Sequence, residues 1–135
     1  GGQMTMMFRG VRGATTVKEN TAEAITNATK ELLQKMIDIN GIEEEYVASV
    51  IFTTSPDLNA VYPAAAARQV GWQRTALLGA QEADVQDGLK RCIRILIHWN
   101  TSKGLDDIQH VYMHGAERLR PDLYPNNKIV LNGKG

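Results

Sequence analysis

The sequence lacks features that several classes of protein require. Its 135 residues include one cysteine, Cys92, so no internal disulfide can form and no second cysteine can complete a metal-ligand pair. No run approaches the roughly 18 apolar residues of a membrane span. The first residues also lack a basic segment followed by an apolar one. We therefore expect a cytoplasmic protein that is not exported.

An excess of either charge is absent too. Fifteen Lys and Arg residues balance fifteen Asp and Glu residues, which removes bulk electrostatic attraction as an argument for nucleic acid or an anionic membrane. Hydrophobic residues make up 43% of the chain and charged residues 22%, as in an ordinary globular domain. A chain of this length buries roughly two-thirds of its unfolded surface, so folding requires neither a disulfide nor a structural metal.

No repeat, low-complexity tract or linker divides the chain, so we predict one domain over residues 6–124. Residues 1–5 begin with two glycines and are interpreted as a tag remnant with a disordered start. Residues 125–135 are polar and rich in asparagine and glycine, and we expect a flexible C-terminal tail there.

The spacing of apolar residues predicts alternating strands and helices. Strands are expected over residues 6–13, 47–54, 75–81 and 110–114. A long helix should run from a cap at Asn20 to Gly41, where a left-handed residue ends a helix cheaply. A short helix over 64–68 should follow Pro63, and an extended arm is expected at 119–121. This order predicts an α/β layer structure with helices packed on a sheet.

Segment 88–99 fits two patterns. Its isoleucines at 93, 95 and 97 alternate as in a strand, whereas Leu89, Cys92, Leu96 and Trp99 repeat as in a helix. The length of the segment favours the helix. We therefore predict a helix whose apolar sequence is interrupted by Arg94.

Motifs for metal binding, nucleophilic catalysis and phosphate binding are not evident. His110 and His114 lie four apart in a predicted strand and can share a face, but no third ligand is evident, so these two and His98 are interpreted as surface or edge residues. Cys92 lies in an apolar run typical of a buried structural thiol, and the serines have no catalytic motif around them. Gly10 to Gly13 lacks the spacing of a phosphate loop. We predict no metal site.

The sequence does contain an unusual set of arginines. Arginine supplies eight of the fifteen basic residues, and four lie at the ends or interruptions of predicted elements: Arg12, Arg68, Arg94 and Arg120. Arg94 either extends its charged end to the surface or forms a rigid carboxylate clamp. In a regular strand Arg9 and Arg12 point to opposite faces, so at most one of them joins a given pocket.

Several short segments together resemble a known family, the monofunctional chorismate mutases of the Bacillus type. The segments are RGVRGATTV at 9–17, PDL at 56–58 with YPA at 62–64, QE at 81–82 with CIR at 92–94, and HVY at 110–112 with LRPDL at 119–123. The match spans about residues 7–123. Independent segments that agree in order and spacing are more specific than one short motif.

The resemblance implies an α/β (α+β) fold, with a mixed β-sheet and helices on one face. It implies a homotrimer of pseudo-α/β-barrel form with active sites at the subunit interfaces. It also implies a reaction, the Claisen rearrangement of chorismate to prephenate on the route to phenylalanine and tyrosine. That reaction is unimolecular and requires no metal and no cofactor, so the expected partners are chorismate, prephenate and other copies of the chain.

The resemblance further implies the residues that act. The expected catalytic residues are Arg94, Glu82 and Arg12. By resemblance Arg94 stabilises negative charge on the breaking ether oxygen, and Glu82 accepts a hydrogen bond from the ring hydroxyl. Arg12, assisted by Tyr112, binds a carboxylate. The full expected substrate-binding set is Arg12, Tyr62, Ala64, Arg68, Gly79, Glu82, Arg94, Tyr112, Leu119 and Arg120.

Several of these residues carry a further expectation. Tyr62, Ala64 and Arg68 should close the pocket from across the interface, while Leu119 and Arg120 should come from the C-terminal arm. Two positions depart from a better-known relative, which has cysteine in place of Gly79 and lysine in place of Ala65. Only the backbone of Gly79 is left there to hydrogen-bond the substrate. Arg9 is left as a structural or surface residue.

A second interpretation comes from a different class of protein. A trimeric small-carboxylate binding or regulatory protein, like noncatalytic members of the enamine/imine deaminase superfamily, would use interface arginines without a reaction. The combination of Glu82 with Arg94 and Tyr112 favours the enzyme over this alternative.

Overall fold

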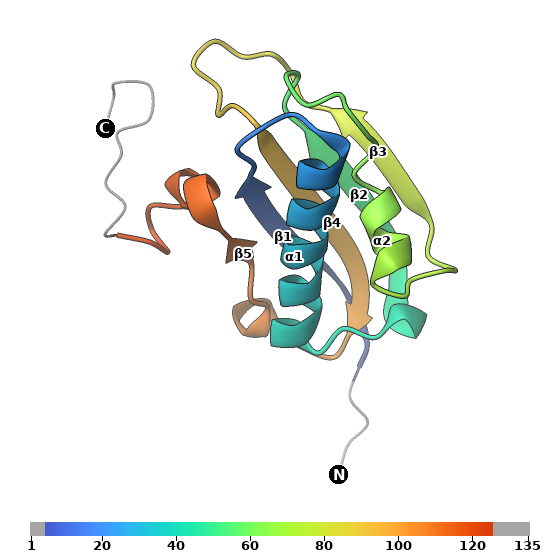
Figure 1. The fold of residues 1–135 in the computed structure, drawn as a ribbon. Helices are drawn as coiled ribbons and strands as arrows, with labels where there is room; N and C mark the ends of the chain where they lie inside the picture. Colours follow the sequence, from blue (N-terminus) through green and yellow to red (C-terminus); the bar gives the residue numbers. More distant parts are fainter. Residues whose placement is uncertain (1–4, 126–135) are drawn as a thin grey trace.

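The computed structural model describes residues 5–125. Five strands form one mixed sheet, and two α-helices lie on one face of it (Figure 1). The strands are β1 (Met7–Thr16), β2 (Val47–Thr54), β3 (Leu77–Gln81), β4 (Cys92–Thr101) and β5 (Val111–Tyr112). The α-helices are α1 (Ala22–Asn40) and α2 (Ala65–Gln69). Three short 3₁₀ helices are η1 (Glu44–Tyr46), η2 (Leu105–Asp107) and η3 (His114–Leu119). The predicted mixed sheet with helices on one face is confirmed. The expectations for residues 1–4 and 126–135 lie outside the described residues.

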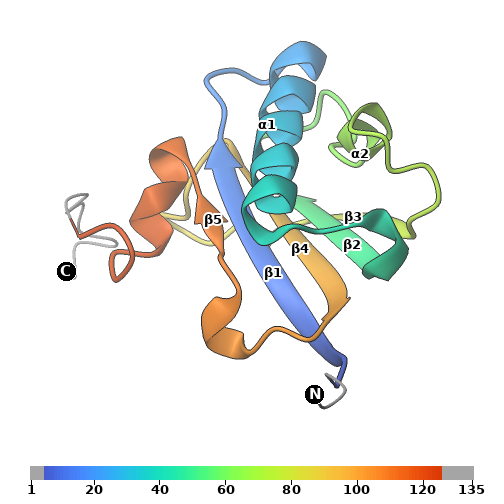
Figure 2. The same ribbon diagram turned by 90° about the horizontal axis from the view of Figure 1, so that it is seen from below.

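Strand β4 is the centre of the sheet. The strand order is β3-β2-β4-β1-β5, and β4 is antiparallel to both of its neighbours, β1 and β2. The two outer strands are parallel to the strands beside them, β3 to β2 and β5 to β1. Seen from below, both helices lie on the same side of this sheet (Figure 2).

The predicted helix over residues 88–99 is wrong, because most of this segment is strand β4. The alternation of isoleucines was the correct signal: Ile93, Ile95 and Ile97 are at most 1% exposed and alternate with the partly exposed Arg94 and Leu96. Residues 88–91, which lengthened the apparent helical repeat, belong to the loop before the strand. A strand that is hydrogen-bonded on both sides outweighs the helical spacing of a few apolar residues.

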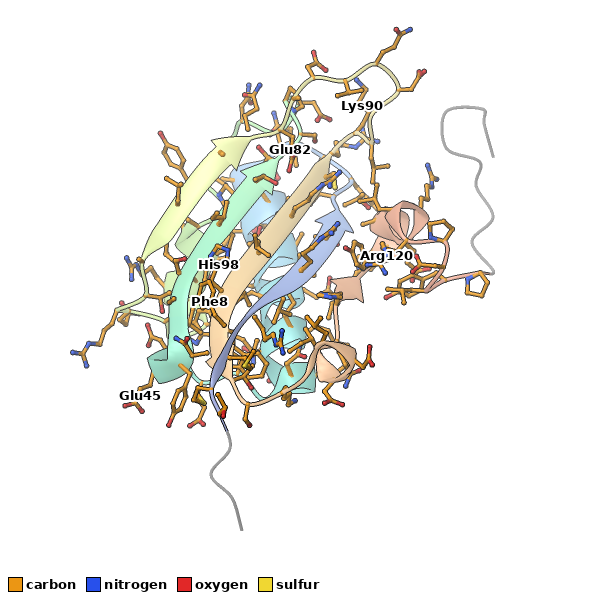
Figure 3. The ribbon with its side chains drawn as sticks, turned by 180° about the vertical axis from the view of Figure 1, so that it is seen from behind. Phe8, Glu45, Glu82, Lys90, His98 and Arg120 are labelled. Carbon is orange, nitrogen blue, oxygen red and sulfur yellow. The ribbon has the colours of Figure 1, made fainter. Side chains whose placement is uncertain are left out.

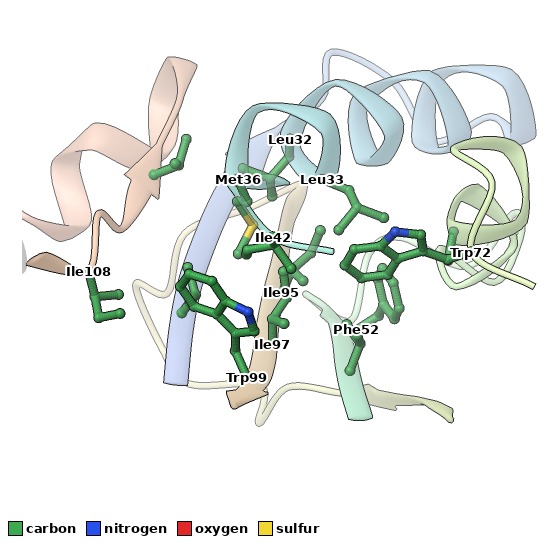
Figure 4. Close-up of a cluster of buried hydrophobic side chains, with 14 residues drawn as sticks. Leu32, Leu33, Met36, Ile42, Phe52, Trp72, Ile95, Ile97, Trp99 and Ile108 are labelled. Carbon is green, nitrogen blue, oxygen red and sulfur yellow. The ribbon is translucent and has the colours of Figure 1, made fainter. Parts of the chain in front are cut away.

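The main core fills the space between β4 and α1 (Figure 4). Helix α1 contributes Leu32, Leu33 and Met36, which are fully buried and lie over Ile95 and Ile97 of the sheet. Full burial of each such side chain contributes about 1.5 to 3 kcal/mol relative to exposure. The sheet and the long helix are therefore held together by the helix-facing residues of the central strand.

Helix α1 is capped at both ends, although not as predicted at its start. Thr21, not Asn20, is the N-cap, and its hydroxyl accepts a hydrogen bond from the Ala24 N–H at 3.1 Å. The Asn20 side chain instead accepts hydrogen bonds from the N–H groups of residues 59 and 60. Gly41 takes the left-handed conformation, with φ of 72°, and ends the helix as predicted.

The segment after β5 also differs from the prediction. The extended arm at 119–121 is wrong, because residues 114–119 form η3, and the Leu123 and Tyr124 N–H groups both bond to the Arg120 carbonyl. The reason is apolar contact: η3 buries Ala116 against Tyr112 and Ala14 of the sheet. The last strand is correspondingly shorter than predicted, at Val111–Tyr112.

The sheet face opposite the helices is not covered by any helix among residues 5–125 (Figure 3). Its register places Phe8 and Arg12 of β1, Leu96 and His98 of β4, and Leu78 of β3 on this face. Phe8 is 61% exposed and stacks on the His98 ring with centroids 5.5 Å apart, and Leu78 is 62% exposed. We call this surface the open face.

None of the helices described is both long enough and apolar enough to cross a membrane.

Gly13 provides a test of the helix–sheet packing. A Cβ atom at Gly13 would clash with Met36 Sδ and lie 3.1 Å from Leu32 Cδ1, so α1 packs directly on the bare backbone. We expect Gly13→Ala to lower the free energy of unfolding by about 1 to 3 kcal/mol, measured by denaturant unfolding. Gly104→Ala is the control, because its Cβ would lie 3.6 Å from Asp107 Oδ2, an ordinary van der Waals contact. Equal stability of the two variants would contradict this packing.

Candidate active site

A pocket of about 220 Å³ opens on the open face, near the edge where four strands end. Strands β1, β2, β3 and β5 finish near this edge, and the antiparallel β4 begins there. The chain therefore brings together residues from distant parts of the sequence. The lining residues are Arg12, Gly13, Ala14, Ile51, Thr53, Glu82, Arg94, Ile95, Leu96 and Tyr112. The three predicted catalytic residues, Arg12, Glu82 and Arg94, all lie on this one pocket.

Arg94 and Glu82 form the charged centre of the pocket. Arg94 projects from β4, and its Nε atom lies 3.8 Å from Glu82 Oε2, which is an ion pair but too long for a hydrogen bond. The Nε atom is buried and has no hydrogen-bond partner among the described residues. A buried N–H without an acceptor is costly, so Arg94 holds an unused donor at the pocket.

Glu82 lies immediately after β3 and is held at two points. Its backbone N–H donates to the Thr54 carbonyl at 2.8 Å, which continues the β2–β3 pairing by one residue. Its carboxylate Oε2 accepts a hydrogen bond of 2.5 Å from the Thr53 hydroxyl. Figure 3 shows Glu82 at the end of β2 and β3, on the face away from the helices.

Tyr112 supplies a second unused polar atom. The residue is 3% exposed on β5, and its hydroxyl is buried near the Arg120 guanidinium without a hydrogen bond of good geometry to any of the described residues. The Arg120 guanidinium lies over its ring, 5.6 Å from the centroid. Arg120 also donates to both carboxylate oxygens of Asp122, at 3.0 and 2.8 Å. This contact raises the pKa of Arg120 and lowers that of Asp122.

Arg12 is exposed on β1, on the opposite strand face from Arg9, as the strand parity predicted. Its backbone N–H donates to His110 Nδ1 at 3.0 Å, so the loop before β5 is tied to the strand that carries Arg12. Arg9 instead donates from Nε to the Lys103 carbonyl at 3.2 Å. Arg9 is thus held away from the pocket, in a structural contact.

A smaller pocket of about 150 Å³ adjoins the first and shares Glu82 and Arg94 with it. Its other walls come from the loop over residues 83–90, from Ser55 and Pro56, and from Cys92. Burial raises the pKa of the Cys92 thiol, while the Arg94 guanidinium acts in the opposite direction. The predicted buried thiol is confirmed, since Cys92 is 3% exposed.

The described chain does not bring the other predicted binding residues to this pocket. Tyr62 is 82% exposed before α2, and Ala64 is the N-cap of α2. Arg68, in α2, donates to the Trp72 carbonyl at 3.2 Å. Gly79 pairs with Phe52, whose side chain points to the helix-covered face. These four residues do not line the pocket within one chain, and neither do Leu119 and Arg120, although Arg120 lies over the Tyr112 ring.

Sequence reasoning missed several lining residues, of which Thr53 makes the most specific contact. The available signal was the strand predicted over 47–54, in which Thr53 alternates with the apolar Phe52. That alternation places Thr53 on the face opposite the core. It does not indicate the contact with Glu82, because Glu82 lies 29 positions further along the chain. The two residues come together only when β3 pairs with β2.

No group of three or more His, Cys, Asp or Glu side chains within residues 5–125 is arranged to hold a metal ion.

Comparison with known proteins gives consistent matches. Residues 8–123 match the model of the family described as chorismate mutase type I. The chain is 53% identical over 118 residues to the chorismate mutase AroH of Thermus thermophilus, covering 87% of this chain and 97% of that one. It is 46% identical over 119 residues to the chorismate mutase AroH of Bacillus subtilis, covering 87% and 94%.

A solved structure agrees with these matches. The fold superposes on a chorismate mutase from Clostridium thermocellum with a TM-score of 0.80 and 48% sequence identity, covering 82% of this chain and 98% of that one. The resemblance inferred from the sequence segments is therefore confirmed.

His110 gives a pH-dependent test of the contact beside Arg12. Burial and then the positive charges of Arg120 and Arg12 lower the pKa of His110 below its ordinary 6.5. The unfolded chain therefore takes up a proton before the folded protein does, and stability present above that ordinary pKa is lost as the pH falls below it. We expect the free energy of unfolding to fall more steeply below about pH 6.5 in the native protein than in His110→Asn. The asparagine amide oxygen can accept the same hydrogen bond without titrating.

Chemical unfolding at a series of pH values checks this expectation. Carboxylates with a lowered pKa, such as Glu44 and Asp57, titrate in a lower pH range. Parallel stability curves for the two proteins between neutral and mildly acidic pH would show that His110 is not held neutral.

Proposed function

The chain belongs to the chorismate mutase type I family, and we propose that the pocket on the open face is where it acts on its substrate. It is an enzyme, an isomerase that converts chorismate to prephenate. One observation carries the placement of the site. Arg94 Nε and Tyr112 Oη, two buried polar atoms without partners in the described part of the chain, belong to residues that line the same pocket. A bound substrate with oxygen acceptors at both places removes the cost of leaving them unpaired.

The rearrangement of chorismate depends on the conformation in which the substrate is held more than on reactive side chains. Chorismate is a dianion that rearranges only when its enolpyruvyl side chain folds over the ring, so a rigid site that holds both ends lowers the barrier. Arg12 and Arg94 are donors on neighbouring strands of one sheet. Strands are stiffer supports than loops. The pocket is suited to fixing a compact dianion.

Arg94 is the proposed catalytic cation. Negative charge develops on the ether oxygen as the carbon–oxygen bond breaks, so a fixed donor at that oxygen favours the transition state over the substrate. The buried and unpaired Nε of Arg94 requires little reorganisation to fill this role. Its charge is balanced by Glu82 at 3.8 Å, which leaves the donor available.

The remaining pocket residues bind the substrate in this proposal. Glu82 accepts a hydrogen bond from the ring hydroxyl, and Arg12 with Tyr112 binds a carboxylate. Leu119 and Arg120 close the pocket from the segment after β5. Arg120 already lies over the Tyr112 ring, which supports its place in the site, although it must then share its guanidinium between Asp122 and the substrate.

We also propose that the protein assembles as a homotrimer with sites at the subunit interfaces. The open face carries Phe8 and Leu78, each more than 60% exposed, without a covering layer among residues 5–125. Exposed apolar surface of this kind favours association. A neighbouring copy would cover the face and bring Tyr62, Ala64 and Arg68, which do not reach the pocket of their own chain. The proposed catalytic domain spans residues 6–124, and the proposed location is the cytoplasm, in phenylalanine and tyrosine biosynthesis.

The alternative of a noncatalytic carboxylate-binding protein is not favoured. The family match covers residues 8–123, which include the arginines, Glu82 and Tyr112 of the pocket. The direct test is incubation of the purified protein with chorismate while its ultraviolet absorbance is followed. Loss of absorbance with formation of prephenate supports the enzyme, and binding without turnover supports the alternative.

Substitution of two arginines separates catalysis from binding. Arg94→Ala should lower kcat about 10²- to 10³-fold, because it removes a donor that acts mainly in the transition state. Arg68→Ala should mainly raise KM, because this residue is proposed only to close the pocket. Steady-state kinetics measure both effects. Similar small changes in KM for the two variants would mean that Arg94 is not the catalytic cation.

Shared sites predict complementation between two variants that both have low activity at a substrate concentration far below the KM of Arg68→Ala. A site of the mixed trimer can combine an intact Arg94 from one subunit with an intact Arg68 from the next. We expect Arg94→Ala and Arg68→Ala proteins, unfolded together and refolded as mixed trimers, to recover activity above the sum of the separate variants. A recovery of roughly a quarter of the sites would follow from random mixing. No recovery in verified mixed trimers would argue against sites built from two subunits.

A further inference from the structure

The hydrogen bond between Thr53 and Glu82 lies in the pocket and has no role in the function proposed above. Thr53 lies on β2 directly opposite Arg94 of β4 and beside Ala80 of β3. It therefore stands between the strand that carries the cation and the strand that leads to the carboxylate. Its hydroxyl donates to Glu82 Oε2 at 2.5 Å, the short distance of a hydrogen bond to a charged acceptor.

The two oxygens of the Glu82 carboxylate have different surroundings. Oε2 faces both the Thr53 hydroxyl and Arg94 Nε, at 2.5 and 3.8 Å. Oε1 makes no hydrogen bond to any residue between 5 and 125. One oxygen is thus held by the protein, and the other is available to a ligand.

Thr53 also bears on the distance between the two charges. A free glutamate beside an arginine gains most by forming direct, charge-assisted hydrogen bonds with the guanidinium. Such a closed pair would occupy the Arg94 donor and the Glu82 acceptor together. In the structure Arg94 Nε remains unpaired although the carboxylate lies 3.8 Å away. The Glu82 carboxylate is hydrogen-bonded to Thr53 instead.

We propose that Thr53 is a positioning residue that holds Glu82 by Oε2 and keeps the Glu82–Arg94 pair open. Oε1 is then free to accept the hydroxyl of the substrate ring, and Arg94 Nε is free to donate to the ether oxygen. This inference rests on the proposed function, because it assigns Thr53 a role through Glu82 and Arg94. Thr53 itself needs no contact with the substrate.

Thr53→Val tests the role, because valine has nearly the same shape as threonine but no hydroxyl, and it is a good strand former. Thr53→Ser is the matched control that keeps the hydroxyl. We expect Thr53→Val to lower kcat/KM roughly 10- to 100-fold, the range for loss of a hydrogen bond to a charged group. Thr53→Ser should stay within about threefold of the native enzyme. Thermal unfolding of each variant checks that the fold is kept, and Thr53→Ala replaces the valine variant if that protein does not fold.

A double-mutant cycle distinguishes positioning from simple packing. If Thr53 acts through the Glu82 carboxylate, adding Thr53→Val to Glu82→Ala should change kcat/KM by less than about twofold. A second readout uses two dicarboxylate inhibitors that differ only in the ring hydroxyl. Thr53→Val should weaken the inhibitor that has the hydroxyl by roughly tenfold and leave the other nearly unchanged.

Two results would overturn the proposal. One is a Thr53→Val enzyme with native kcat/KM. The other is a loss that is equally large without the Glu82 carboxylate, or equal for the two inhibitors. Both leave the proposed function intact as long as the native protein converts chorismate and Arg94→Ala does not, so the two failures can be told apart.

Discussion

The alternation of side chains along the central strand β4 is the constraint on which the rest of the structure depends. Ile93, Ile95 and Ile97 point to the helices and form the core, so the residues between them must point to the other face. Arg94 therefore reaches the open face because its neighbours are buried on the opposite one. A one-residue shift in register would bury the guanidinium and expose the isoleucines. Packing of the core and placement of the proposed catalytic cation therefore follow from the same alternation.

The pocket on this face leaves hydrogen-bonding groups unsatisfied. Two buried polar atoms, on Arg94 and Tyr112, lack partners within the described residues, whereas folded proteins satisfy most such atoms. The fold tolerates this cost because the surrounding contacts are strong: Glu82 is bonded to both Thr53 and the Thr54 backbone. Unused donors on a rigid sheet are what a rearrangement without reactive groups requires, since they stabilise developing charge without having to move.

The sequence predicted much of this arrangement where local patterns decide the outcome. The long helix and its end at Gly41, the packing of helices on a sheet and the opposite directions of Arg9 and Arg12 follow from periodicity and backbone conformation, whereas the mixed sheet came from the resemblance. The pattern of segment 88–99 predicts a helix because loop residues extend the apolar run, and only pairing with β1 and β2 identifies most of it as a strand. The contact of Thr53 with Glu82 spans 29 positions, and no local pattern contains it. The roles of Arg12, Glu82 and Arg94 came from resemblance, and the fold brings these three residues to one pocket.

A crystal structure of the protein with a dicarboxylate transition-state analogue would decide whether the pocket on the open face is the active site. We expect Arg94 Nε and Tyr112 Oη each to lie about 3 Å from a ligand oxygen, with Glu82 Oε2 still hydrogen-bonded to Thr53 and Oε1 on the ligand hydroxyl. A ligand bound elsewhere, with both atoms still unpaired, would show that this pocket is not the site. A carboxylate of Glu82 that has turned away from Thr53 to close on Arg94 would contradict the positioning role of Thr53.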